Sequence, residues 1–353
     1  MTSLFARTTR RITLAHIRHV PTVPPRQASG LVAQVYRQVE EDFGLLAPPV
    51  ALHAPAPAQL AAAWTILRET LIVEGMVSRA AKEIVAAAVS LANSCPYCVD
   101  VHGATLAGLN AGTDAAHVMA DRIDAVADPS LRALARWARA SGTAPSRGSP
   151  APPPFPRAHE PELVGVATAF HYYNRMVNVF LPDSPLPPVS GRARMLARSA
   201  AAWKMGRLAR VPARPGTSVD LLPTAPLPTD FWWAEGQPRI AAALSRAAAV
   251  FDAGGQRSVP AGARRMVGDL LPTGEPPAIG AGRWFDDTVN TLPAHERALG
   301  RLTLMVALAS YRVTDAVVEA VNDPHDGRRV IEIAGWASFT AARRVGASLA
   351  AAR

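Results

Sequence analysis

The sequence predicts an all-α protein built from two tandem copies of one helical unit, the second copy degenerate. Alanine, the strongest helix former, fills segments such as AAKEIVAAAVSLA and AAALSRAAAV. Apolar residues recur with a helical period, and no window shows the alternation with period two that a half-buried strand requires. The 353 residues exceed what one hydrophobic core comfortably holds, so two units are expected.

The first half divides into helices with recognisable start and stop signals. Pro57 suits a first helical turn, and Gly75 suits a stop. Ser78 can cap the next helix, which contains Glu83, and the Asn93-Ser94 pair should end it. We expect helices over 31–43, 57–75, 79–91, 96–110 and 131–140.

The composition changes near the middle of the chain. The stretch SGTAPSRGSPAPPPFPR, residues 141–157, is rich in proline, glycine and serine and is typical of a surface loop. Beyond it we expect helices over 160–181 and 191–209, a proline-rich span over 211–228, and a second alanine-rich series from Gln237-Pro238 onward. The expected regions are a basic segment (1–28), a thiol-active helical domain (29–185, with a loop at 141–159), a connector (186–228) and a degenerate repeat (229–353).

A faint internal repeat supports the two-copy arrangement. Aligning Cys95 with Ala309, a shift of about 214 residues, places SCPYCVDVH on LASYRVTDA. Tyr97 then meets Tyr311, while both cysteines and the histidine are replaced in the second copy. The alternative is chance similarity between alanine-rich helices. If the repeat is real, only the first copy has kept the thiols.

Composition and charge exclude several classes of function. The formal net charge is +9, but the basic residues are spread along the chain, and only Lys82 and Lys204 among the 37 are lysine. Without a basic patch interleaved with aromatics, zinc-finger spacing or a Walker loop, we do not expect nucleic-acid binding. No apolar run approaches the roughly 18 residues of a membrane span, so we expect no membrane partner.

The N-terminal part of the chain bears on localisation. Its first 38 residues carry several arginines and no acid, which resembles a transit peptide. A flexible basic terminus is the preferred interpretation, and a cytoplasmic location is expected. In that reducing compartment a close cysteine pair is more often catalytic or metal-binding than a structural disulfide.

The two cysteines of the chain are three residues apart, in the segment CPYC. Pro96 favours the first position of a helix, which makes Cys95 the cap and places Cys98 in the first turn. The unpaired N–H groups and helix dipole there favour a thiolate, and such sites lower a cysteine pKa from about 8.5 to roughly 3.5–7.5. His102 lies four residues after Cys98, on the same helix face, where it can accept the thiol proton.

Glu83 is a candidate third group of this site. It precedes Cys95 by twelve residues, on the preceding helix. If the two helices pack antiparallel across the Asn93-Ser94 break, its carboxylate can reach the face that carries His102. A partly desolvated acid in that position could relay a proton.

Two simpler interpretations of the cysteine pair remain open. Free cysteines are often buried as small hydrophobic residues. A zinc ion held by Cys95, Cys98 and His102 would need a fourth ligand, and the sequence has no second C-x-x-C or H-x3-H element, so no metal is expected. His171 is expected to be a packed core residue, and Arg79 and Lys82 are expected to lie on a solvated helix face.

The arrangement of Glu83, CPYC and His102 resembles the Glu-x11-Cys-x-x-Cys-x3-His signature of the alkylhydroperoxidase D-like and carboxymuconolactone decarboxylase-like family. The resemblance extends more loosely over about residues 20–140 and includes the helix break between the two parts of the motif. It implies an alkylhydroperoxidase D-like helical bundle that often assembles into homo-oligomers.

The resemblance also implies a mechanism. Cys98 would attack the peroxide and become a sulfenic acid, and Cys95 would resolve it as a disulfide. His102 and Glu83 would form the proton relay, and an external dithiol or reductase protein, with no bound cofactor, would restore the thiols. This chain has Tyr97 where the best-known members have histidine.

Three functions therefore stand as hypotheses. The first is a thiol peroxidase that acts on an organic hydroperoxide or hydrogen peroxide. The second is a non-catalytic, oligomerising or ligand-binding protein whose thiols sense redox state, which the thiol-free second half favours. The third is a decarboxylase of the kind named in the family, although that chemistry has no evident need of two redox thiols.

Overall fold

The computed structural model describes residues 10, 13–142, 152–185, 191–272, 280–321, 323 and 325–352. Every regular element in these ranges is helical, which confirms the all-α fold class. Residues 1–9 of the predicted basic segment and 143–151 of the predicted loop lie outside the described residues. The division of the chain into four regions stays a prediction.

The helices of the first half begin and end close to the predicted signals. Ser78 caps α5, its hydroxyl accepting a hydrogen bond from the amide of Ala81 at 3.2 Å. Asp128 caps α8 in the same way, with the N–H groups of Ser130 and Leu131 at 2.8 and 3.0 Å. The elements are α2 (Gly30–Asp42), α3 (Pro48–Ala51), α4 (Pro57–Leu67), α5 (Arg79–Ala92), α6 (Pro96–Leu106), α7 (Gly112–Met119) and α8 (Pro129–Ala140).

Two of these helices continue as single π-helical turns. Arg68–Ile72 extends α4, and Ala107–Ala111 extends α6 into α7. Wider turns of this kind often occur at functional sites or where packing forces an extra residue into a helix. The predicted helices over 57–75 and 96–110 therefore each contain a local change of pitch that the apolar pattern does not reveal.

The remaining helices follow the predicted alanine-rich series. Pro238 opens α11 at its first position, as expected. The elements are α9 (Glu160–Phe180), α10 (Gly191–Leu208), α11 (Pro238–Ser258), α12 (Ala261–Leu270), α13 (Ala281–Val289), α14 (Arg297–Ala309), α15 (Asp315–Glu319) and α16 (Arg328–Ala351), with a 3-10 turn η9 (Ser310–Arg312) between α14 and α15.

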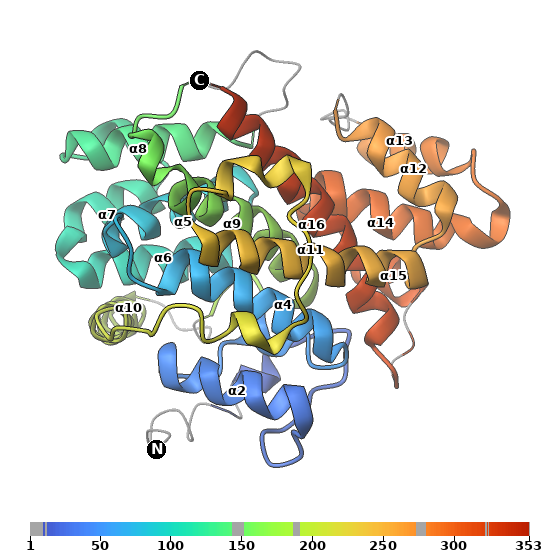
Figure 1. The fold of residues 1–353 in the computed structure, drawn as a ribbon, viewed down its shortest axis with the longest axis horizontal. Helices are drawn as coiled ribbons and strands as arrows, with labels where there is room; N and C mark the ends of the chain where they lie inside the picture. Colours follow the sequence, from blue (N-terminus) through green and yellow to red (C-terminus); the bar gives the residue numbers. More distant parts are fainter. Residues whose placement is uncertain are drawn as a thin grey trace.

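The helix α9 lies at the centre of the molecule (Figure 1). It packs against α5 on one side and along α16 on the other. In Figure 1, α5 to α8 lie on one side of this pair, and α12 to α15 lie on the opposite side. Nearly all of α9 is buried, and one continuous apolar core runs through both halves of the chain. A residue on α9 can therefore contact elements of both halves.

A tight corner joins α5 to α6 and positions the cysteines. Ser94 has φ +50°, in the left-handed region that non-glycine residues seldom adopt. The chain then turns back, and the amide of Cys95 donates to the carbonyl of Ser90 at 2.9 Å. Pro96 is the first residue of α6. This turn lets α6 pack against α5, the helix that carries Glu83. Within the described ranges, no helix combines the length and apolar character needed to cross a bilayer.

Candidate active site

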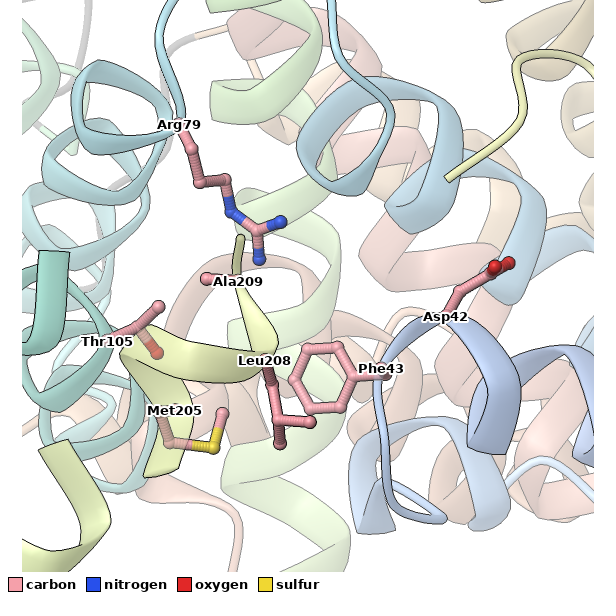
Figure 2. A pocket seen from close by; sticks show the side chains of 7 residues that line it. All are labelled: Asp42, Phe43, Arg79, Thr105, Met205, Leu208 and Ala209. Carbon is pink, nitrogen blue, oxygen red and sulfur yellow. The ribbon is translucent and has the colours of Figure 1, made fainter. Parts of the chain in front are cut away.

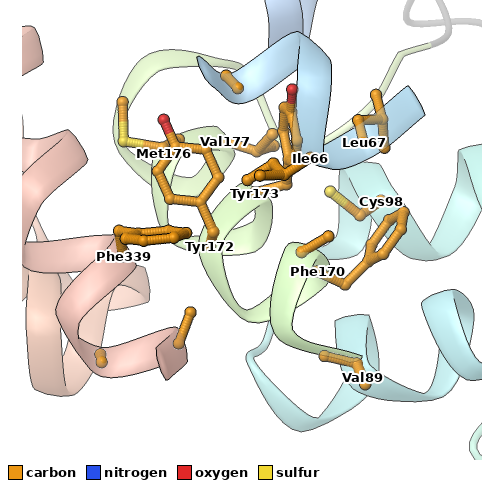
Figure 3. Close-up of a cluster of buried hydrophobic side chains, with 14 of the residues drawn as sticks. Ile66, Leu67, Val89, Cys98, Phe170, Tyr172, Tyr173, Met176, Val177 and Phe339 are labelled. Atoms are coloured by element: carbon orange, nitrogen blue, oxygen red, sulfur yellow. The ribbon is translucent and has the colours of Figure 1, made fainter. Parts of the chain in front are cut away.

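Cys95 and Cys98 lie at the start of α6, in the positions predicted for them. Cys95 is the N-cap residue and Cys98 is in the first turn. Both are free thiols, 1% and 3% exposed respectively. Figure 3 shows Cys98 beside Phe170 and Tyr173 of α9, at the edge of the central apolar cluster. The thiols are thus shielded from bulk water.

Glu83 and His102 are in direct contact. The Oε2 atom of Glu83 lies 2.7 Å from Nδ1 of His102, and the two residues are 0% and 9% exposed. The other oxygen of Glu83 accepts from Nε of Arg79 at 2.7 Å. The ring of Phe170 packs edge-on against the imidazole, with centroids 4.4 Å apart. The α5–α6 corner therefore brings the predicted acid and histidine together across the helix pair.

The electrostatics of this contact fix the direction of its hydrogen bond. Burial raises the pKa of the Glu83 carboxyl, but the charge of Arg79 and the contact with His102 outweigh burial and leave the pKa below its ordinary value. An ionised carboxylate only accepts hydrogen bonds, so Nδ1 of His102 carries the proton. In a neutral imidazole this arrangement leaves Nε2 as the proton acceptor.

The environments of Cys95 and Tyr97 oppose ionisation. Burial, and then the neighbouring Cys98, raise the pKa of the Cys95 thiol well above its ordinary value, while a hydrogen bond from Asn174 lowers it. Burial also raises the pKa of the Tyr97 phenol, and the two cysteines add to that effect. Tyr97 is 4% exposed and meets the ring of His16 edge-on. Tyr97 therefore remains a neutral, packed side chain beside the thiols.

A polar cluster from α9 lies beneath the corner, and the sequence analysis did not predict it. Asn93 Nδ2 donates to Oδ1 of Asn174 at 3.1 Å, and Asn174 Nδ2 donates to the hydroxyl of Ser90 at 3.0 Å. Arg175 donates to Oδ1 of Asn93 at 3.2 Å, and Asn178 donates to its backbone carbonyl at 3.1 Å. The sequence feature that could have predicted this cluster is the spacing of four residues in HYYNRMVN. This spacing places polar residues on one face of an otherwise apolar helix.

A surface hollow lies outside the Glu83–His102 contact (Figure 2). Arg79, which is paired with Glu83, forms part of its wall. The other lining residues come from the end of α2, from α6 and from the end of α10: Asp42, Phe43, Thr105, Met205, Leu208 and Ala209. In Figure 2, Phe43 and Leu208 lie close together on one side of the hollow, while the Arg79 guanidinium projects towards it. The hollow thus combines an apolar wall with one cation, Arg79, and one carboxylate, Asp42.

Two expectations about neighbouring residues need correction or refinement. Lys82 is not on a solvated face: it is 1% exposed and pairs with Glu162 at 2.7 Å. Arg79 is also partly buried, in its ion pair with Glu83. His171 is a packed residue, as predicted, and additionally hydrogen-bonds to Asn93 and to Ser141. Burial, with the charge of Arg175, holds the pKa of His171 well below its ordinary value.

The catalytic roles of Cys98, Cys95, His102 and Glu83 stay predictions, although the structure brings these residues to one corner. In the described part of the chain, no three His, Cys, Asp or Glu side chains form a group that could hold a metal ion. The arrangement offers a buried thiol pair, a histidine that can take a proton, and a carboxylate that orients the histidine.

Comparisons with known proteins place this site in context. Residues 58–140, which include all four predicted catalytic residues, match the model of the carboxymuconolactone decarboxylase family. Over 341 residues the chain is 37% identical to a Mycobacterium tuberculosis protein named alkyl hydroperoxide reductase, and the alignment covers 95% of this chain and 96% of that protein. A solved structure, the alkylhydroperoxidase AhpD core of an uncharacterized peroxidase-related protein from Ralstonia eutropha, aligns with a TM-score of 0.41 at 20% identity. The alignment covers 55% of this chain and 97% of that one.

Proposed function

The chain belongs to the alkylhydroperoxidase D-like and carboxymuconolactone decarboxylase-like family, and we propose that it is a thiol peroxidase acting through Cys98 and Cys95. The observation that carries the proposal is the buried contact of 2.7 Å between Glu83 and His102, one helical turn beyond Cys98. A thiol at a helix N-terminus is activated as a nucleophile when a neighbouring base can take its proton and an acid holds that base in place.

The first step is attack of the Cys98 thiolate on the terminal oxygen of a hydroperoxide. His102 accepts the thiol proton at Nε2, while Glu83 holds the opposite ring nitrogen. A sulfur–oxygen bond forms as the oxygen–oxygen bond breaks, and the leaving alkoxide takes a proton to become an alcohol. Cys98 is thereby oxidised to a sulfenic acid.

The second step converts the sulfenic acid into a disulfide, which an external reductant can reduce back to two thiols. The Cys95 thiolate attacks the sulfenic sulfur of Cys98, the disulfide forms, and the oxygen leaves as hydroxide, which is protonated to water. An external dithiol or a reductase protein then reduces the disulfide by thiol–disulfide exchange. The apolar surroundings of Cys98, which belongs to the buried hydrophobic cluster, favour an organic hydroperoxide over hydrogen peroxide.

The test is peroxide consumption by the full chain with dithiothreitol as reductant. The proposal predicts turnover by the wild type, loss of turnover in Cys98→Ser, and a higher kcat/KM for cumene hydroperoxide than for hydrogen peroxide. Equal consumption by wild type and Cys98→Ser would refute it. Reversible oxidation of the thiols without turnover would instead support the redox-sensing alternative. Assembly into a homo-oligomer also stays a prediction, which sedimentation equilibrium tests directly.

A further inference from the structure

The helix α10 exposes large apolar side chains at the edge of the molecule (Figure 1). Met195, Leu196 and Trp203 are each more than half exposed, and Val211 follows shortly after the helix. These four are among seven large hydrophobic side chains that are exposed in the described part of the chain. Such a concentration of exposed apolar side chains in one short segment marks an interaction surface.

The opposite side of α10 is fixed against α6 and the π-helical turn that follows it. Gly206 and Gly108 approach so closely that a Cβ atom on either glycine would overlap the backbone of the other segment. The carbonyl of Ala202 lies at the same crossing. Met205 lines the hollow together with Thr105 of α6. These contacts define an inward face of α10, which is already filled.

The outward face carries apolar and basic side chains together. Leu196, Trp203 and Arg207 share one side of the helix because they are seven and four residues apart, and Arg192 precedes Leu196 by four. The guanidinium of Arg207 lies over the ring of Trp203, 5.8 Å from its centroid. α10 is therefore apolar on both sides, although only one side meets the rest of the chain.

The segment around this face has basic charges only. Between Asp183 and Asp220 the sequence contains six arginines and one lysine and neither aspartate nor glutamate. Asp100 of α6 lies 3.7 Å from Arg198 and offsets part of the charge of that residue. A surface with this excess of positive charge attracts a negatively charged partner.

We propose that the outward face of α10 is a docking surface for an anionic lipid membrane. A second copy of the chain does not fit through the same face, because α10 has no acid to meet the opposing arginines. A bilayer supplies both partners at once, since its headgroups attract the basic residues and its acyl boundary accepts the apolar ones. Tryptophan is enriched at that boundary.

This docking differs from membrane insertion. The expectation of no membrane partner came from the absence of a spanning segment, and docking at a surface does not require one. The proposal also uses none of the residues of the thiol site. Cys98→Ser should therefore bind vesicles as the wild type does, so failure of the peroxidase function and failure of this inference are separate outcomes.

The experiment is cosedimentation of the full chain with vesicles of phosphatidylcholine mixed with phosphatidylglycerol, compared with phosphatidylcholine alone. The wild type should partition onto the mixed vesicles at least about tenfold more strongly, because several basic residues face the anionic headgroups. Raising the salt concentration should remove most of that difference. Equal partitioning onto both vesicles, or none onto the mixed ones, would overturn the proposal.

Variants of the outward face test its two components. Arg192→Gln and Arg207→Gln should each weaken partitioning about fivefold, the effect of one basic residue near an anionic surface. Trp203→Ser should weaken it at least about tenfold, since a large apolar side chain no longer leaves water. The matched controls are Trp232→Ser and Arg265→Gln, which change exposed residues outside α10 and should bind as the wild type does.

Three further results would contradict the proposal. The first is wild-type partitioning of Trp203→Ser, which would leave charge as the sole attraction, as for an acidic protein. The second is equal loss of partitioning in the control variants. The third is an oligomer, seen by sedimentation equilibrium, that Trp203→Ser dissociates while the wild type binds no vesicles, because the face would then join copies of the chain.

Discussion

Two helix ends contact the same central helix, yet only one of them carries thiols. The amide of Asn178 donates to the α5–α6 corner at Asn93 and to the α14–η9 corner at Ser310. After the first corner, Pro96 opens an eleven-residue helix. After the second corner the chain makes a 3-10 turn of three residues and a helix of five. The second corner therefore lacks a long helix whose N-terminus could favour a thiolate.

The burial of matching residues differs just as clearly. Tyr97 is 4% exposed, whereas Tyr311, its counterpart in the sequence alignment, is 51% exposed. Ala316, which takes the place of His102, is also exposed. α9 packs against both α5 and α6 at the first corner, and α10 packs against α6 further along the helix. The two corners therefore differ in the burial of the helix start as well as in the residues themselves.

The largest expected effect comes from removing Cys98, the proposed nucleophile, at the first corner. Cys98→Ser should lower peroxide turnover by at least about 1000-fold, because the hydroxyl of serine is a far weaker nucleophile at neutral pH. The matched change at the second corner, Arg312→Ala, should leave turnover within about twofold. Steady-state peroxide consumption measures both. A comparable loss of turnover in Arg312→Ala would show that the second corner also takes part in catalysis.

The next effect concerns the proton relay. Glu83→Gln should lower kcat/KM for peroxide about 100-fold, because a neutral amide no longer favours the imidazolium that forms on His102. Glu162→Gln is the control, since Glu162 is an equally buried carboxylate paired with Lys82 outside the site. That variant should lose stability but keep its kcat/KM. Turnover by Glu83→Gln at the wild-type rate would remove Glu83 from the mechanism.

The two halves of the chain also differ in how their histidines make the stability of the fold depend on pH. His53 is buried and hydrogen-bonded to the hydroxyl of Tyr172, and burial lowers its pKa to about 4. The histidines of the described second half, His295 and His325, are exposed. Because the unfolded chain binds a proton at His53 below about pH 6.5 and the folded chain does not, stability falls as the pH falls from 6.5 towards 4.

This contribution amounts to about 3 kcal/mol by pH 4. Urea unfolding of the wild type and of His53→Gln at pH 7 and pH 4 measures it. His53→Gln should be less stable at pH 7, since the pairing with Tyr172 changes, but should lose about 3 kcal/mol less between the two pH values. His295→Gln serves as the exposed control. If His53→Gln loses as much stability as the wild type between pH 7 and pH 4, His53 is not the source of the pH dependence.

The smallest expected effect is at the tyrosine between the cysteines. Tyr97 is buried and its pKa is raised, so the phenol stays protonated at neutral pH and we expect it to take no part in the proton relay. Tyr97→Phe should keep kcat/KM within about threefold, as should Tyr311→Phe at the second corner. A loss of 100-fold in Tyr97→Phe alone would show that the phenol takes part in the relay.

Much of the fold and part of the site could be predicted because the relevant signals are local. Proline marks the starts of α4 and α6, serine caps α5, and the spacing of four places His102 one turn beyond Cys98. The contact between Glu83 and His102 also followed from a sequence feature, the helix break at Asn93-Ser94, which lets the two helices pack together.

The unpredicted parts depend on partners far away in the sequence. Lys82 is buried because Glu162, 80 residues later, lies 2.7 Å from its amine. Asn174 and Asn178 hydrogen-bond to Asn93 because α9 passes beneath the α5–α6 corner. No local sequence pattern predicts which face of a helix packs against which turn. Solvation of Lys82 was inferred from its charge alone, and that inference was wrong because the counter-charge comes from another element.

The most direct test of the account is the fate of the two thiols after one equivalent of cumene hydroperoxide in the absence of reductant. The account predicts an intramolecular disulfide between Cys95 and Cys98, seen by mass spectrometry as the loss of two hydrogens and of both alkylation sites. Cys95→Ser should stop at a sulfenic acid on Cys98. If both thiols of the wild type remain fully alkylatable and the peroxide is not consumed, the α5–α6 corner is not a thiol peroxidase site.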